Sequence, residues 1–90
     1  MKILAIDTSS DNCSVALDIN NNYFESNVFE AKSHTQVLLP MINDLLDEAN
    51  ILMSEVDAIV LGIGPGSFIG MRIGASVAQG LAFAANVKII

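Results

Sequence analysis

The segment Gly64-Pro65-Gly66-Ser67 has the residue types of an anion-binding loop. It follows an apolar run at 56–63 and precedes a helical pattern, so its backbone amides could hold a phosphate at a helix N-terminus. No Lys-Ser/Thr pair follows the glycines, which excludes a Walker A loop. Glycines at a strand-to-helix turn also serve close packing, and the pattern alone leaves both interpretations open.

Polar residues also follow the first apolar run, 2–6. Asp7, Thr8 and Ser9 stand at the carboxyl end of an expected strand, where parallel-sheet proteins bind ligands. A carboxylate there could hold a cation–phosphate pair, although caps of turn amides are the more common role for such residues. The residues of this candidate nucleotide or anion loop are Asp7, Thr8, Ser9, Gly64, Gly66 and Ser67.

The chain has one cysteine, Cys13, and one histidine, His34. One of each cannot form a Cys/His zinc site, so we expect no metal site and no bound cofactor. His34 follows Ser33, which with Gln36 forms a capping-box pattern, so a structural role is favoured over a catalytic triad with Ser67. Cys13 begins an alternating strand pattern and is expected to be a small buried side chain.

Composition narrows the classes of partner. The net charge is −6, with four Lys and Arg residues scattered along 90 residues, so a basic nucleic-acid surface is excluded and any RNA contact would have to come through a partner. The apolar run near the N-terminus is too short for a signal peptide, and no segment is long enough for a membrane span. We expect a cytoplasmic protein without a membrane partner.

Periodicity predicts an α/β fold in one domain. Strands are expected at 2–6, 13–19, 23–29, 56–63 and 87–90, and helices from 33 to about 50 and from 70 to 85. This βββαβαβ order predicts a five-stranded mixed sheet with two helices. Asn20-Asn21-Asn22 predicts a hairpin turn, Asn50 and Asn86 the helix ends, and Pro40 a kink or a weakened first turn.

The second helix is small or apolar on nearly every side, with Gly70, Gly74 and Ala78 in a row at a spacing of four. Such a row lets another backbone approach closely, and a helix that is apolar all round is normally buried. We therefore expect a helical partner interface, in which Gly74→Leu would abolish association and leave the fold largely intact. The interface residues are Leu39, Ile42, Leu46, Met71, Gly74, Ala75 and Ala78.

Three segments together resemble the TsaB (YeaZ) family: ILAIDTSSDNCSVAL, SHTQVLLPMINDLLDEA and DAIVLGIGPGSFIGMRIGASVAQGLAFA. Ile69 departs from the family pattern, which has a small hydroxylated residue there. The resemblance implies an RNase H-like (actin/Hsp70/sugar-kinase-like) half-domain. Residues 1–90 would be the N-terminal subdomain, and the second subdomain would lie outside this chain.

The resemblance also implies a function. Family members serve in making threonylcarbamoyladenosine in tRNA as non-catalytic partners of TsaD, the catalytic subunit, with the ATPase TsaE in the complex; alone, they form homodimers. TsaD carries an H-x-x-x-H metal motif, whereas Leu38 stands four residues after His34 here. Two alternatives remain: a phosphotransferase of the actin fold that uses Asp7 and residues 64–67 with Mg-ATP, and a peptidase that uses Ser67 or Cys13.

Overall fold

The computed structural model of this chain describes residues 1–8, 12–28, 34–62 and 68–89. The strands and α-helices follow the predicted βββαβαβ order, with one 3-10 helix that the pattern does not predict. The fifth strand is only two described residues long. The elements are β1 (Lys2–Asp7), β2 (Cys13–Ile19), β3 (Asn22–Val28), α1 (His34–Ala49), the 3-10 helix (Met53–Glu55), β4 (Ala58–Leu61), α2 (Phe68–Ala85) and β5 (Lys88–Ile89).

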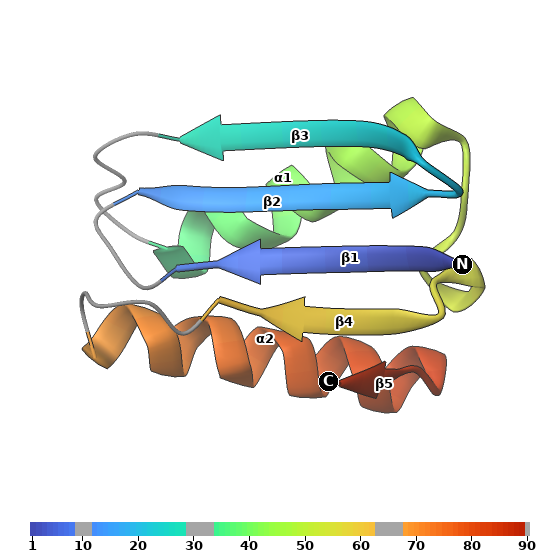
Figure 1. The fold of residues 1–90 in the computed structure, drawn as a ribbon. Helices are drawn as coiled ribbons and strands as arrows, with labels where there is room; N and C mark the ends of the chain where they lie inside the picture. The colour runs from blue at the N-terminus through green and yellow to red at the C-terminus, as the bar shows by residue number, and fades with distance from the viewer. Residues whose placement is uncertain (9–11, 29–33, 63–67, 90) are drawn as a thin grey trace.

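The strands form one mixed sheet in the order β3-β2-β1-β4-β5 (Figure 1). β1 pairs antiparallel with β2 and parallel with β4, which in turn pairs parallel with β5. At one end of β1, Lys2 N–H donates to the Asp57 carboxylate at 2.7 Å, and Asp57 N–H donates to the Lys2 carbonyl at 2.8 Å. At the other end, Gly62 N–H donates to the Ile6 carbonyl at 2.8 Å. The β1–β4 pair is therefore fixed at both ends.

The hairpin between β2 and β3 turns on two asparagines. Asn20 and Asn21 have φ of 51° and 74°, and Ile19 pairs directly with Asn22 across them. Positive φ at both central residues is the type I′ geometry, whose twist matches that of the strands. The predicted turn is confirmed.

Asparagine also ends both helices. Asn50 and Asn86 each have φ of 57°, directly after α1 and α2. The next amide bonds back to the helix: Ile51 N–H donates to the Leu46 carbonyl at 3.1 Å, and Val87 N–H to the Ala82 carbonyl at 2.9 Å. These are the bonds of the Schellman motif, which satisfy carbonyls that the helix leaves unpaired.

α1 continues through Pro40. Proline lacks the N–H that would bond to the Gln36 carbonyl, but both residues are exposed, so water can take the place of that bond. The cap predicted at Ser33 lies outside the described residues.

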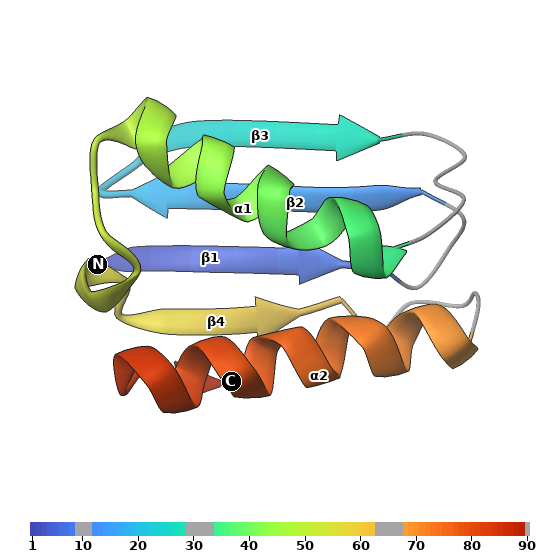
Figure 2. The same ribbon diagram turned by 180° about the vertical axis from the view of Figure 1, so that it is seen from behind.

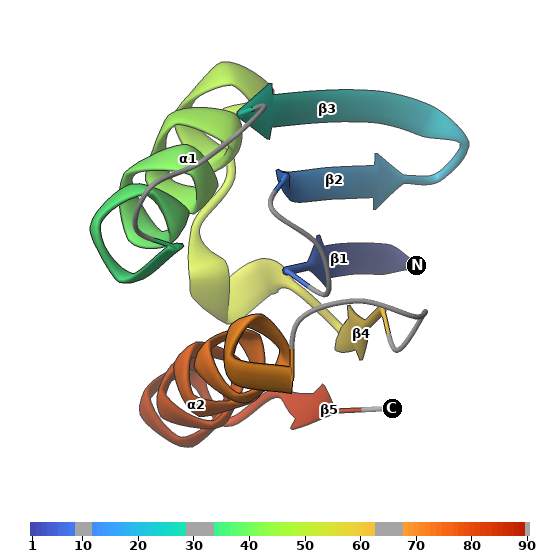
Figure 3. The ribbon, with the colours of Figure 1, turned by 90° about the vertical axis from the view of Figure 1, so that its left-hand side faces the viewer.

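Both helices cover the same face of the sheet (Figures 2 and 3), with α1 over β2 and β3 and α2 over β1, β4 and β5. Alternate strand residues face these helices, and they meet one apolar stripe of α1. Each large side chain buried there contributes about 1.5–3 kcal/mol. The fully buried members are Leu4, Ile6, Cys13, Val15, Leu17, Leu38, Ile42, Leu45 and Ile59. No described helix covers the opposite face, called here the open face.

Gly74 joins α2 to the end of β1. It is buried, and a Cβ placed on it would collide with Oγ1 of Thr8, itself only 3 % exposed. The hydrogen of glycine is thus needed for α2 to lie against the residue that follows β1. This finding corrects the expectation for Gly74→Leu, because a leucine here would disrupt the fold and not only an association surface.

Gly74 and Gly80 provide a matched pair for testing this contact, because both lie within α2. No atom lies within 4 Å of a Cβ built on Gly80, which is exposed. Gly80→Ala should stabilise the chain by about 0.5–1 kcal/mol through helix propensity. Gly74→Ala should leave the chain less stable than Gly80→Ala by about 1–3 kcal/mol, since it overpacks Thr8.

Urea denaturation of the two variants measures this difference, and Thr8→Ala supplies the control. Thr8→Ala removes the clashing oxygen, so the cost of Gly74→Ala should shrink in the Thr8→Ala background. Equal free energies of unfolding for Gly74→Ala and Gly80→Ala would contradict the packing account.

Cys13 begins β2 and is fully buried in the core. Burial raises the pKa of the thiol, and the negative charge of Asp7 raises that pKa further. The folded chain therefore holds the thiol protonated, whereas the thiol of the unfolded chain ionises at its ordinary pKa.

The raised pKa of Cys13 predicts a pH dependence of stability. Above about pH 8.5 the unfolded thiol loses its proton while the folded thiol keeps it, so the free energy of unfolding should fall as pH rises. Urea midpoints at pH 7 and 9.5 measure this fall, and Cys13→Ala should make it smaller. A fall of the same size in Cys13→Ala would show that other groups cause it.

Candidate functional site

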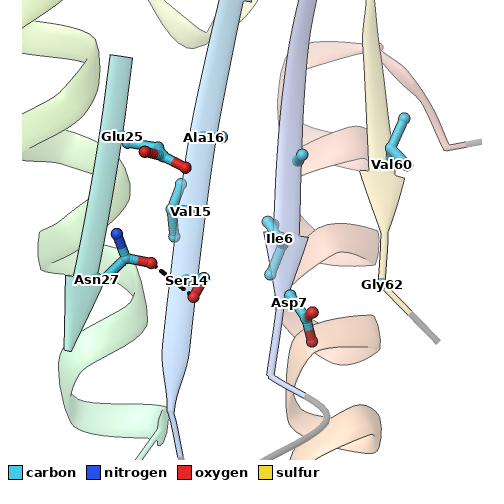
Figure 4. A pocket seen from close by; sticks show the side chains of 10 residues that line it. Ile6, Asp7, Ser14, Val15, Ala16, Glu25, Asn27, Val60 and Gly62 are labelled. Carbon is cyan, nitrogen blue, oxygen red and sulfur yellow. Dashed lines mark hydrogen bonds between the residues drawn. The ribbon is translucent and has the colours of Figure 1, made fainter. Parts of the chain in front are cut away.

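The carboxyl ends of β1 and β4 lie side by side, and Asp7 and Gly62 meet there (Figure 4). A Cβ built on Gly62 would lie 2.7 Å from Cγ and 3.0 Å from Oδ2 of Asp7. Any larger residue at this position would push the Asp7 carboxylate aside. The Asp7 side chain is exposed on the open face, where it can meet a ligand.

A polar row extends from Asp7 across the next two strands. Asp7 pairs with Ser14, and Ser14 pairs with Asn27. Ser14 Oγ donates to Asn27 Oδ1 at 2.8 Å, so the two side chains orient each other (Figure 4). The row combines a carboxylate, a hydroxyl and an amide, which can together accept and donate hydrogen bonds.

This row borders a hollow of about 240 Å³ in the sheet. Ala5, Ala16 and Val60 line it with small or apolar side chains from β1, β2 and β4, and Glu25 of β3 adds a second carboxylate. A hollow with two carboxylates suits a cationic or hydrogen-bond-donating group better than an anion. Its lining residues are Ala5, Ile6, Asp7, Ser14, Val15, Ala16, Glu25, Asn27, Val60 and Gly62.

The structure separates two residues that the sequence analysis grouped in one loop. Asp7 lies on the open face beside Gly62, whereas Thr8 is buried against Gly74 of α2. Their side chains therefore do not converge on one ligand. Ser9, Gly64, Gly66 and Ser67 lie outside the described residues. Sequence reasoning missed Ser14 and Asn27, although both stand at alternating strand positions, Ser14 in β2 beside β1 and Asn27 in β3 beside β2.

The structure also places the residues expected at a partner interface. Ile42, Leu46, Gly74 and Ala78 are buried within the chain, so these four are corrected to core residues. Ala75 is half-buried and Leu39 is 43 % exposed. The Met71 side chain lies outside what the structure describes.

The exposed side of α2 is a different stripe. Its members follow one another at helical spacing and include a second row of small residues. It also includes Phe83, which is 91 % exposed. We call this set the outer stripe of α2; it comprises Arg72, Ser76, Gln79, Gly80, Phe83 and Ala84. Arg72, Ser76 and Gln79 could have identified it from sequence, because polar residues at this spacing mark the exposed side of a helix.

The described residues contain no group of three His, Cys, Asp or Glu side chains that could hold a metal ion. Cys13 is poorly suited to act as a nucleophile, because a nucleophilic cysteine needs an accessible thiolate and a lowered pKa. Burial and Asp7 raise the pKa of Cys13 instead. No helix in the described ranges is long and apolar enough to span a membrane.

Comparison with known proteins places the chain in a family. The family model of TsaD, tRNA N6-adenosine threonylcarbamoyltransferase, matches residues 28–90. Two relatives are tRNA threonylcarbamoyladenosine biosynthesis proteins TsaB. The chain is 43 % identical to that of Haemophilus influenzae, covering 100 % of this chain and 38 % of the relative. It is 44 % identical to the TsaB protein of Escherichia coli, covering 100 % of this chain and 39 % of that relative.

This chain is also 31 % identical to a tRNA N6-adenosine threonylcarbamoyltransferase of Clostridium botulinum, and it covers 32 % of the length of that protein. Among solved structures, YeaZ from Pseudomonas aeruginosa superposes with a TM-score of 0.92 at 47 % identity, over 99 % of this chain and 42 % of that one. The chain thus spans about two fifths of the length of the TsaB relatives it matches. The family-model match over residues 28–90, together with the closer identity to TsaB proteins, shows that this chain belongs to the TsaB (YeaZ) family.

Proposed function

We propose that this chain serves in the making of threonylcarbamoyladenosine in tRNA, as part of a non-catalytic subunit that binds a TsaD-like catalytic subunit. Its TsaB relatives are tRNA threonylcarbamoyladenosine biosynthesis proteins, which supports this pathway. Identity of 43 % and 44 % to TsaB proteins, against 31 % to a threonylcarbamoyltransferase, supports the partner role over the catalytic one.

The geometry of the candidate site supports a non-catalytic role. Asp7 and Thr8 diverge, and Cys13 has a raised pKa in the core. Neither the phosphotransferase arrangement nor the peptidase arrangement is therefore favoured by these residues. We propose that residues 1–90 form the N-terminal, RNase H-like (actin-like) subdomain of the subunit.

The single observation that carries the proposed contact is Phe83, which is 91 % exposed on the outer stripe of α2. An aromatic side chain of this size gains most when a partner covers it. Beside it, Ser76, Gly80 and Ala84 form a small-residue row at a spacing of four, which lets a partner helix approach closely. Leu39 adds a second exposed apolar side chain, from α1.

The same surface serves two assemblies in this proposal. A TsaD-like subunit occupies it in the complex, which a TsaE-like ATPase joins, and a second copy occupies it when the chain is alone. Any tRNA contact comes through the partner, since the chain carries a net charge of −6. The proposed setting is the cytoplasm.

Substitutions on the outer stripe should weaken association without unfolding the chain. Phe83→Ala should lower the affinity for the TsaD-like subunit about ten- to a hundredfold, because burial of a Phe side chain is worth about 1.5–3 kcal/mol. Gly80→Leu should also weaken binding, since it places a large side chain on the small-residue row. Titration calorimetry measures both affinities, and light scattering measures the loss of the homodimer of the 9.6 kDa chain.

Gly80→Ala is the control, because it adds a single methyl group where no atom lies within 4 Å. It should bind the partner far better than Gly80→Leu. If Phe83→Ala and Gly80→Leu both bind with the affinity of the unaltered chain, the outer stripe is not the interface. Circular dichroism confirms that each variant is folded.

Nucleotide binding separates this proposal from the phosphotransferase alternative. We expect Mg-ATP to bind weakly or not at all, because Thr8 is buried against Gly74 and two carboxylates line the hollow. Titration of the chain with Mg-ATP tests this expectation. A dissociation constant in the low micromolar range, raised by Asp7→Asn, would favour the phosphotransferase.

A further inference from the structure

β3 lies at one edge of the sheet, and its outer side pairs with no strand within the described residues (Figures 1 and 3). The two-residue turn makes Ile19 and Asn22 a hydrogen-bonded pair, and pairs alternate from there along the hairpin. The backbone N–H and C=O groups of Tyr23, Glu25 and Asn27 therefore point away from β2. Three donors and three acceptors stand along this edge at regular spacing.

Apart from the single charge of Glu25, the edge lacks the features that usually protect such strands. Asn22–Val28 contains no proline, lysine or arginine, and its seven residues pair with β2 in an unbroken register without a bulge. Natural sheets commonly use prolines, lysines, bulges or very short strands to prevent pairing with another chain. An edge of this length without them can accept a further strand.

Charge decides which kind of strand fits. Asp7, Asp18 and Glu25 stand at the alternating positions that share the open face, and Glu25 is the only charged residue of β3. In the antiparallel register of greatest overlap, a second copy would place its own Glu25 opposite this Glu25. Like charges directly opposite each other destabilise a strand pair, so a second copy is disfavoured.

We infer that the β3 edge binds an extended segment of another polypeptide, with a lysine or arginine opposite Glu25, as an additional antiparallel strand. Side chains that flank this cation meet Tyr23 and Asn27 on the open face, and Tyr23, which is 72 % exposed, suits a β-branched neighbour. The outward backbone groups of β3 supply affinity, and Glu25 supplies selectivity. This inference does not depend on the proposed function, which concerns α2.

A short peptide tests the inference directly. The probe is the acetylated and amidated peptide Thr-Val-Thr-Lys-Thr-Val-Thr. Its sequence reads the same in both directions, so the central lysine can lie opposite Glu25 whichever way the peptide runs along β3. Nuclear magnetic resonance should show that the amide protons of Tyr23, Glu25 and Asn27 exchange more slowly, by at least about tenfold at saturation, when the peptide is bound. The amides of Phe24 and Ser26, which already face β2, should change less.

Two control peptides isolate the two sources of binding. A peptide N-methylated at both valines and at the lysine loses the amide protons that would face β3, so it should not protect the edge. Replacement of the lysine by glutamate should weaken binding at least about fivefold, because attraction to Glu25 becomes repulsion.

Two variants of the chain test the role of Glu25. Glu25→Gln should weaken binding of the lysine peptide by up to about fivefold. Asp44→Asn removes the same charge from an exposed position on α1 and should leave binding unchanged.

The inference is overturned if the amides of Tyr23, Glu25 and Asn27 gain no protection, or if the N-methylated peptide protects them equally. Protection that grows with the concentration of the chain alone would instead identify a second copy as the occupant. Equal binding of the lysine and glutamate peptides would show that charge does not select the strand.

Discussion

The two-sided pairing of β1 is the constraint on which the rest of this structure depends. β1 is the only described strand with an antiparallel neighbour on one side and a parallel neighbour on the other. Asp57 fixes its start to β4, and Gly62 fixes its end. Because β1 cannot shift along β4, the residues that follow it have fixed positions: Asp7 meets Gly62 on the open face, and Thr8 meets Gly74 under α2.

Local chemistry explains why most of the fold could be predicted. Asparagine tolerates positive φ better than most residues, and all four positive-φ residues of the described chain are asparagines at element ends: Asn20, Asn21, Asn50 and Asn86. The alternation of residues in Cys13–Ile19 correctly predicted which side of β2 faces the core. The 3-10 helix was missed because three residues are too few to show a periodic pattern. Backbone bonds hold it, from Glu55 N–H to the Leu52 carbonyl at 2.9 Å and from Val56 N–H to the Met53 carbonyl at 3.1 Å, and Leu52 N–H also donates to the Glu55 carboxylate at 2.6 Å.

The proposed partner interface was less predictable, because it depends on which way a nearly uniform helix faces. α2 has small or apolar residues on every side, so the row of Gly74 and Ala78 and the row of Ser76, Gly80 and Ala84 look alike in sequence. Gly74 and Thr8 are 66 residues apart in the sequence. It is their contact in the fold that shows that the first row faces inward. The available signal was the three polar residues of the outer stripe, Arg72, Ser76 and Gln79, and the apolar character of the rest of the helix outweighed it.

The arrangement of the layers allows the two proposed binding surfaces to act at the same time. α2 packs over β1, β4 and β5, whereas β3 is the opposite edge of the sheet (Figure 3). A partner on the outer stripe of α2 approaches the helical face, and a strand added to β3 extends the sheet in its own plane. Occupancy of one surface therefore leaves the other accessible. The row of Asp7, Ser14 and Asn27 lies on the open face, away from both helices, so its hollow is also independent of a partner bound at α2.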